Sequence, residues 1–169
     1  MKRIQTFGLI RDKMTGYWGE RLVLFATTLN LGTCWVGGTY DRKLCERQIA
    51  AGDRLVCALA IGLVEDDMGM REGLKYRLIH RSVKPVEKMC RYDRREEWFM
   101  AGMEAVRLAP SAMNRQGVVM TLKCGTVTAR VSAGPYAMAD LGIAKLHFEL
   151  AAGPGHWDWG NNALFTRDE

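Results

Sequence analysis

Disulfide and metal-binding patterns are missing from this sequence of 169 residues. It has five cysteines, an odd number, and none of them forms a CxxC pair. Its three histidines do not cluster with any cysteine at the spacing of metal ligands. Scattered thiols of this kind are typical of the reducing cytoplasm rather than of a disulfide framework. We therefore expect a cytoplasmic protein without a metal site.

Long apolar runs are missing as well. The longest, LVCALAIGLV at residues 55–64, is far shorter than the roughly 20 residues that a membrane-spanning helix needs. The basic start MKRIQTFGLI is not followed by the apolar stretch or the cleavage site of a secretion signal. The sequence thus predicts no membrane partner.

Concentrated charge of one sign is the third absence. The net charge of +5 is mildly basic, which suits a phosphate-bearing ligand or nucleic acid. The densest basic cluster, at residues 91–95, is countered by acidic residues at 93, 96 and 97. A solvated helix start explains this cluster better than a nucleic-acid surface does, so we expect no nucleic-acid partner. A basic nucleic-acid binder, which would bind with steep salt dependence, is kept as a third hypothesis.

Helical and strand patterns alternate along the sequence. Helices are expected at 16–29, 42–51, 94–109 and 139–152. Asp41 is the expected N-cap of the second helix, and Pro110 should stop the third. Strands are expected at 55–64, 117–123 and 125–131, with a possible short strand at 1–11, and a glycine-bearing loop at TCWVGGTYD, residues 33–41. The aromatic tail from residue 156 is given no strand.

Apolar spacing also predicts which faces of two helices are buried. In the first helix these residues are Leu22, Phe25, Ala26 and Leu29. In the third helix they are Trp98, Ala101, Ala105 and Leu108.

Two stretches share one layout, a helix followed by small residues and a tryptophan. They are GERLVLFATTLNLGTCW at 19–35 and LGIAKLHFELAAGPGHW at 141–157. Chance similarity competes with duplication here, since few residues are identical. A duplicated unit predicts a single domain of two pseudo-symmetric halves, about 1–82 and 94–169, joined by a connector at 83–93. Ligand sites often lie between such halves.

The loop TCWVGGT contains the first candidate for ligand binding. Gly37 and Gly38 permit backbone conformations closed to other residues and let a ligand approach the chain. A tight turn is the competing explanation, and it is favoured for a lone GG pair.

The segment PSAMNRQ, residues 110–116, is the second candidate. Ser111 and Asn114 offer a hydroxyl and a carboxamide three residues apart, which can both donate and accept at the edge of a pyrimidine-like ring. Local capping after Pro110 explains the same residues. No Ser-His-Asp relay, P-loop, GxGxxG motif or carboxylate pair is present, so no catalytic side chain is predicted. Cys34 is expected to be buried, and His147 to be a satisfied core or interface histidine.

Taken together, these segments resemble the nitroreductase family of flavin enzymes, in the branch that carries two half-subunits in one chain. The resemblance is carried, in the order of that branch, by GERLVLFATTLNLGTCWVGGTYDR (19–42), ALAIGLV (58–64), VRLAPSAMNRQ (106–116) and DLGIAKLHFELA (140–151). It implies an α+β fold, with a mixed or antiparallel sheet flanked by helices.

The resemblance also implies a cofactor and a reaction. FMN would lie between the halves, with one segment facing its pyrimidine part and a glycine backbone near N5. The residues that this implies are Pro110, Ser111, Ala112 through its backbone, Asn114, Gln116, Gly37 and Gly38. NAD(P)H would reduce the flavin, and a nitroaromatic, a quinone or a similar small molecule would accept the electrons. The chain would be a pseudo-dimeric monomer or a homodimer.

The sequence departs from this family at the phosphate clamp. Family members usually open with an arginine- and serine-rich segment that holds the FMN phosphate, and no such segment is found here. Two lost charge-assisted contacts would weaken FMN binding roughly a hundredfold. Arg71, Arg77 or Arg107 is a candidate replacement. A truncated or degenerate relative without activity, with a weak or empty flavin site, is therefore the second hypothesis.

Overall fold

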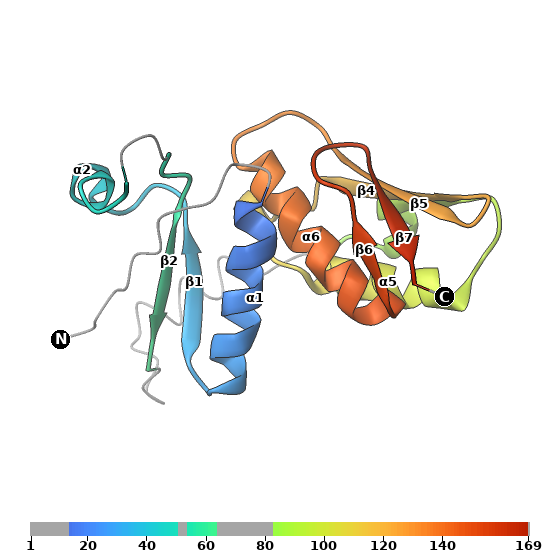
Figure 1. Ribbon diagram of the computed structural model, residues 1–169, viewed down its shortest axis with the longest axis horizontal. Helices are drawn as coiled ribbons and strands as arrows, with labels where there is room; N and C mark the ends of the chain where they lie inside the picture. Colours follow the sequence, from blue (N-terminus) through green and yellow to red (C-terminus); the bar gives the residue numbers. More distant parts are fainter. Residues whose placement is uncertain (1–13, 51–53, 64–82, 169) are drawn as a thin grey trace.

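The computed structural model of the chain describes residues 14–50, 54–63 and 83–168 (Figure 1). Two sheets lie on either side of a central pair of helices, α1 and α6. The helices are α1 (Thr15–Thr28), α2 (Arg42–Glu46), α4 (Val86–Met89), α5 (Glu97–Leu108), the 3-10 turn η1 (Ala112–Asn114) and α6 (Ala137–Ala152). The strands are β1 (Gly32–Val36), β2 (Ala58–Gly62), β3 (Cys90–Tyr92), β4 (Val118–Lys123), β5 (Thr126–Val131), β6 (Gly155–Trp157) and β7 (Ala163–Arg167).

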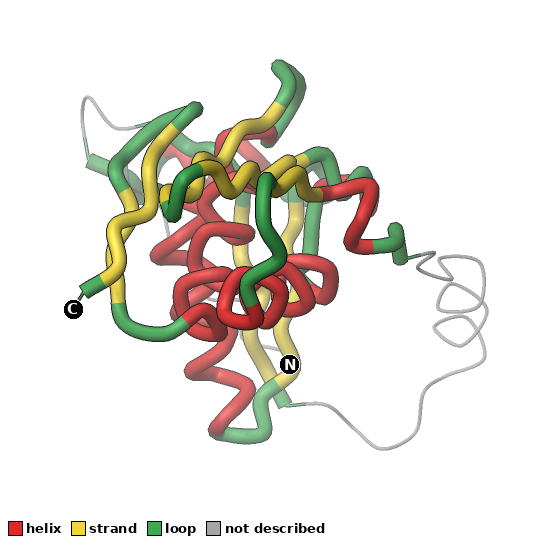
Figure 2. Tube along the Cα trace, turned by 90° about the vertical axis from the view of Figure 1, so that its right-hand side faces the viewer, coloured by secondary structure: helices red, strands yellow, loops and turns green. Residues whose placement is uncertain are grey.

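The larger sheet has the order β3-β4-β5-β7-β6, in which β3 pairs with β4 in parallel and every other pair is antiparallel. The smaller sheet pairs β1 with β2 in antiparallel orientation. Helix α6 packs against the larger sheet, and α1 lies between α6 and the smaller sheet (Figure 1 and Figure 2). The expected α+β fold with a mixed sheet and flanking helices is therefore confirmed.

Helix α6 is the centre of the molecule and packs along both α1 and α5. Most of its residues are buried, as expected for a helix that is apolar on all sides. Its backbone approaches that of α1 so closely that a Cβ on Gly16 would lie 1.8 Å from the carbonyl oxygen of Ala139. A Cβ on Gly142 would lie 2.6 Å from the backbone nitrogen of Tyr17. Two glycines therefore permit this contact.

The main core lies between α5, α6 and the larger sheet. Its fully buried side chains include Phe99, Met103, Met120, Val127 and Phe148. The rings of Phe99 and Phe148 meet edge to face, with their centroids 5.8 Å apart. Burial of these large apolar groups is the main stabilising contribution.

Several local predictions are confirmed. The side chain of Asp41 accepts a hydrogen bond from the backbone N–H of Leu44 and caps α2. Helix α5 ends at Leu108, directly before the extended Ala109 that precedes Pro110. The hairpin β4–β5 turns at Cys124 and Gly125, both with positive φ, as a two-residue turn requires.

The predicted buried faces of both long helices are correct only in part. On α1, Ala26 is buried as predicted, but Phe25 is 62% exposed and Leu29 is 55% exposed, and the other buried residues include Tyr17, Glu20 and Val23. On α5, Leu108 is 65% exposed, and the buried residues are Phe99, Met100, Gly102, Met103 and Val106. The true faces contain glycine and a carboxylate, which a search for large apolar residues passes over.

Some predicted elements also differ from the structure. Residues 33–36 of the expected glycine loop at 33–41 belong to β1, and α2 ends at Glu46 rather than at 51. The tail forms β6 and β7, and the expected connector at 83–93 contains α4 and β3. The expected strand at 1–11 lies outside the described residues. Within the described part of the chain, no helix has the length and apolarity needed to cross a membrane.

Candidate functional site

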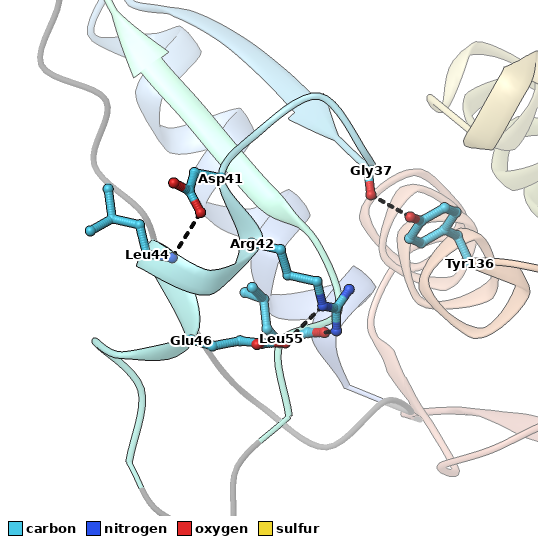
Figure 3. A network of polar contacts seen from close by, with 7 residues as sticks. All are labelled: Gly37, Asp41, Arg42, Leu44, Glu46, Leu55 and Tyr136. Carbon is cyan, nitrogen blue, oxygen red and sulfur yellow. Dashed lines mark hydrogen bonds and ion pairs between the residues drawn. The ribbon is translucent and has the colours of Figure 1, made fainter.

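The part of the glycine loop that follows β1, residues 37–41, touches the start of α6. The carbonyl of Gly37 accepts a hydrogen bond from the hydroxyl of Tyr136 (Figure 3). A Cβ on Gly37 would lie 3.0 Å from the tyrosine ring, so the contact is tight enough to favour glycine. A Cβ on Gly38 would meet no atom within 4 Å. The loop is thus held at its first glycine and open at its second.

Tyr136 stands at the N-cap of α6 in an unusual backbone conformation. Its φ of 62° and ψ of 5° are left-handed, and a bulky side chain is a genuine outlier there. Its side chain does not cap the helix, because its hydroxyl binds Gly37 instead. Conformations of this kind persist only where the surrounding structure holds them, and they cluster at functional sites.

The segment PSAMNRQ makes a compact turn between α5 and β4. The backbone N–H of Asn114 donates to the carbonyl of Ser111 at 2.9 Å. Met113, Asn114 and Gln116 all have positive φ. The N–H of Ala112 donates to the carboxylate of Asp140, in the first turn of α6, at 2.8 Å. The predicted backbone contact of Ala112 is thus directed at Asp140.

Gln116 closes this turn from the inside. Its side chain is 6% exposed. Its amide oxygen accepts from the N–H of Lys84 at 2.8 Å, and its amide nitrogen donates to the carbonyl of Arg107 at 2.9 Å. Its own N–H donates to the hydroxyl oxygen of Ser111 at 3.0 Å. The side-chain amide of Gln116 therefore links the segment to Lys84 and to Arg107 at the end of α5.

The structure brings the two predicted segments to the same end of α6. Gly37 is bound by Tyr136 and Ala112 by Asp140, and the N–H of Asp140 donates to the carbonyl of Tyr136 at 2.9 Å. The glycine loop and the segment PSAMNRQ, residues 110–116 (the Pro-Ser segment), are therefore held one helical turn apart. Beside residues 110–116, and away from the glycine loop, lies a small cavity bordered by Pro110, Ser111, Gln116 and Asp140 among others, with space for about one water molecule.

Two ionisable groups at this end have perturbed pKa values. Burial raises the pKa of Asp140, while the N–H of Ala112 and the charge of Arg115 act in the opposite direction. Burial also raises the pKa of Tyr40, and nearby Arg42 lowers it. The hydroxyl of Tyr40 is buried and has no hydrogen-bond partner among the described residues. Buried polar groups normally have a partner, so this hydroxyl is an exception: a hydrogen-bond donor that no described residue satisfies.

The proposed phosphate-binding arginines divide into two groups. Arg107 pairs with Glu104 at 2.7 Å, and Arg71 and Arg77 lie outside the described residues. Arg115, which the sequence analysis did not single out, has its guanidinium 3.6 Å from the Cβ position of Gly134, just ahead of α6. Arg115 therefore carries a positive charge at the end of the helix where the two segments meet.

Hydrogen bonds of the buried Glu20 to Trp35 and His147 link β1, which leads into the glycine loop, to α1 and α6. The carboxylate of Glu20 on α1, 1% exposed, accepts from the indole N–H of Trp35 at 2.9 Å. Its other oxygen lies 2.9 Å from Nε2 of His147 on α6. His147 is thus a satisfied interface histidine, as predicted. Cys34, in contrast, is exposed on β1, so its predicted burial is wrong.

Sequence reasoning missed Tyr136, Asp140 and Tyr40. The last helix was expected to begin at residue 139, two residues after its actual start at Ala137. An acidic residue is common in the first turn of a helix and could have indicated Asp140, but capping alone accounts for that signal. No local pattern marks Tyr136, because its partner lies 99 residues away in sequence. Among the described residues, no group of three metal-ligating side chains occurs.

Comparison with known proteins identifies the family to which the chain belongs. Residues 9–152 match the sequence model of the family described as "Putative TM nitroreductase". The fold is similar to that of a protein from Thermotoga maritima whose crystal structure is described as that of a putative nitroreductase, with a TM-score of 0.65. The two share 17% sequence identity over 98% of this chain and 75% of the other, a level that shows the fold alone. No curated protein matches the sequence.

Proposed function

This chain belongs to the family described as "Putative TM nitroreductase", and we propose that it is an FMN-dependent oxidoreductase. The observation that supports this most is the meeting of the glycine loop and the Pro-Ser segment at the first turn of α6. Neither segment is specific alone. Their convergence from positions 75 residues apart, Gly37 and Ala112, is what a site built from both requires.

The residues at this end of α6 fit a planar ring with polar edges. The open space at Gly38 leaves room for a ring against the backbone. The hydroxyl of Tyr40 has no partner among the described residues, but it is enclosed by the protein and would reach a ring only after exposure. The hydroxyl of Ser111 accepts from Gln116 and keeps its own hydrogen to donate. The open backbone at Gly38 and the free hydroxyl hydrogen of Ser111 are the features that support ring binding here.

The phosphate would face Arg115. Its guanidinium lies beside Gly134, ahead of the amino end of α6, where the helix dipole also favours negative charge. The described groups that we propose for the phosphate are thus one cation and a helix end, and the cation can form charge-assisted hydrogen bonds.

A bound flavin would supply two-electron transfer between NAD(P)H and an acceptor such as a nitroaromatic or a quinone. The residues of this chain would hold and orient the ring rather than transfer protons. Backbone groups of the glycine loop would lie along one ring edge, and the Pro-Ser segment along the other. Preorganised dipoles of this kind stabilise charge that develops during a reaction without reorganising.

The activity test is NAD(P)H oxidation by the purified chain, with and without added FMN, in the presence of a quinone or a nitroaromatic acceptor. We expect turnover that requires FMN and saturates with it. A chain that binds FMN but oxidises neither nucleotide would contradict the enzymatic proposal.

A non-enzymatic relative is the second candidate, and one observation favours it. The N–H of Ala112 and both amide groups of Gln116 already have partners within the chain. Three of the groups expected to contact a flavin are thus satisfied without it. A chain that fails to bind FMN would support this candidate.

A further inference from the structure

The first turn of α6 makes hydrogen bonds to both segments of the candidate site. Tyr136 donates to the carbonyl of Gly37, and Asp140 accepts from the N–H of Ala112. The two residues lie four positions apart and are joined by a backbone hydrogen bond of 2.9 Å. A rigid helical turn therefore connects two segments that do not adjoin in sequence.

The backbone of Tyr136 suggests that this connection has a role beyond packing. A residue in left-handed conformation at a helix start is usually glycine or asparagine, which adopt it at little cost. Here a tyrosine occupies the position, and its ring lies 3.0 Å from where a Cβ on Gly37 would be. The strained backbone points the hydroxyl at the glycine loop rather than at the helix end.

Asp140 shows the same pattern on the other segment. Its side chain is 7% exposed, and burial raises its pKa. A buried carboxylate is costly unless it is hydrogen-bonded, and the partner it has is the N–H of Ala112. Arg115 is the charged group whose field reaches it. The carboxylate thus ties the Pro-Ser segment to the helix.

We propose that Tyr136 and Asp140 are positioning residues that set the separation between the glycine loop and the Pro-Ser segment, and so the affinity of the site for flavin. This inference rests on the proposed function. The pair acts through the backbone of Gly37 and Ala112 and needs no contact with the flavin. The spacing of the two ring-binding segments would then depend on one helical turn.

The test combines amide hydrogen exchange of the free chain with FMN titration of single variants. Tyr136→Phe keeps the ring and removes the hydrogen bond. Tyr92→Phe is the matched control, because Tyr92 is exposed on β3 and its ring contacts Phe99 of α5 rather than either segment. Asp140→Ala removes the acceptor, and Asp140→Asn restores a neutral one. Thermal unfolding of each variant establishes that it is folded.

We expect Tyr136→Phe to speed exchange at residues 36–38 and to raise the FMN dissociation constant roughly tenfold, the effect of one hydrogen bond. Asp140→Ala should speed exchange at 111–113 and raise the constant by about tenfold or more. Asp140→Asn should recover most of the affinity, and Tyr92→Phe should match the parent chain. Restored affinity in Asp140→Asn would separate positioning from a general loss of stability.

Several results would overturn the inference. Unchanged exchange in Tyr136→Phe and Asp140→Ala would show that the helical turn does not hold the segments. Faster exchange with unchanged FMN affinity would show that it holds them without positioning a ligand. If the parent chain binds no FMN, the proposed function fails and this inference falls with it. If the parent binds and the variants bind equally, only the inference fails.

Discussion

Gly38→Ala tests whether the space beside the glycine loop is reserved for a ligand. A Cβ at this position would meet no atom within 4 Å, and Gly38 has no positive φ that a side chain would strain. Replacement of glycine by alanine at such a site reduces the freedom of the unfolded chain. The free protein should therefore be unchanged, or stabilised by ~0.4–1 kcal/mol.

The same methyl group should oppose flavin binding. A ring packed against the backbone at Gly38 would lie within van der Waals contact of it, and displacement of the ring would cost the contacts on that face. We expect FMN affinity to fall at least about tenfold, which corresponds to ~1.4 kcal/mol. Gly37→Ala is the contrasting variant. Its Cβ would press on Tyr136 at 3.0 Å, so it should lower the stability of the free chain as well.

Urea denaturation of the free chains and fluorescence titration with FMN measure the two effects separately. Stability and affinity should move in opposite directions, or affinity alone should move, in Gly38→Ala. Equal FMN affinity in Gly38→Ala and the parent would refute the placement of the ring. A marked loss of stability in the free variant would show that the space at Gly38 is not open.

Four other predictions follow from the described contacts. Glu20→Ala, which orphans two buried hydrogen-bonding groups, should lower the free energy of unfolding by about 2–4 kcal/mol in urea denaturation, and Glu20→Gln by less. Burial lowers the pKa of Lys145 from 10.5 to about 8, so above pH 8 the unfolded chain binds more protons than the folded chain and the free energy of unfolding should rise with pH. Relative to Lys145→Met, this rise should be about 2 kcal/mol from pH 8 to 9.5 in urea denaturation. Equal pH dependence in the two chains would contradict the lowered pKa. A thiol reagent should label Cys34 and Cys124 rapidly in the native chain and the other three cysteines only after denaturation. Arg115→Ala should weaken FMN about tenfold and leave riboflavin affinity unchanged, whereas equal losses for both would remove Arg115 from the phosphate site.

The elements that could be predicted from sequence are those with local signals. Pro110 ends α5, Asp41 caps α2, and the Cys124–Gly125 turn joins β4 to β5, each through chemistry confined to a few residues. The α+β class follows from such elements together. The segments at residues 37–38 and 110–116 could also be singled out, because glycines and a Pro-Ser-Asn turn are unusual locally.

The parts that could not be predicted depend on distant partners. β1 is extended because it pairs with β2, and its residues 32–36 read as a loop when considered alone. β6 and β7 likewise depend on pairing with each other and with β5. The buried face of α1 is set by close packing at Gly16 and by the partners of Glu20, and neither shows in apolar spacing.

The candidate site shows the same division. Its backbone segments were visible in the sequence, but the residue pair that unites them was not. Tyr136 and Asp140 have ordinary sequence surroundings, and their significance lies in contacts 99 and 28 residues away. Gln116 shows the converse. Its motif indicated ligand binding, but both groups of its side-chain amide form hydrogen bonds within the chain.

The most direct test of the account is a titration of the purified chain with FMN, followed by flavin fluorescence. The proposed site predicts a saturable change with one flavin per candidate site, reversed by competing FMN analogues that keep the ring and the phosphate. No change at FMN concentrations well above those that saturate flavin enzymes would contradict the central claim, and would leave a nitroreductase fold without its cofactor.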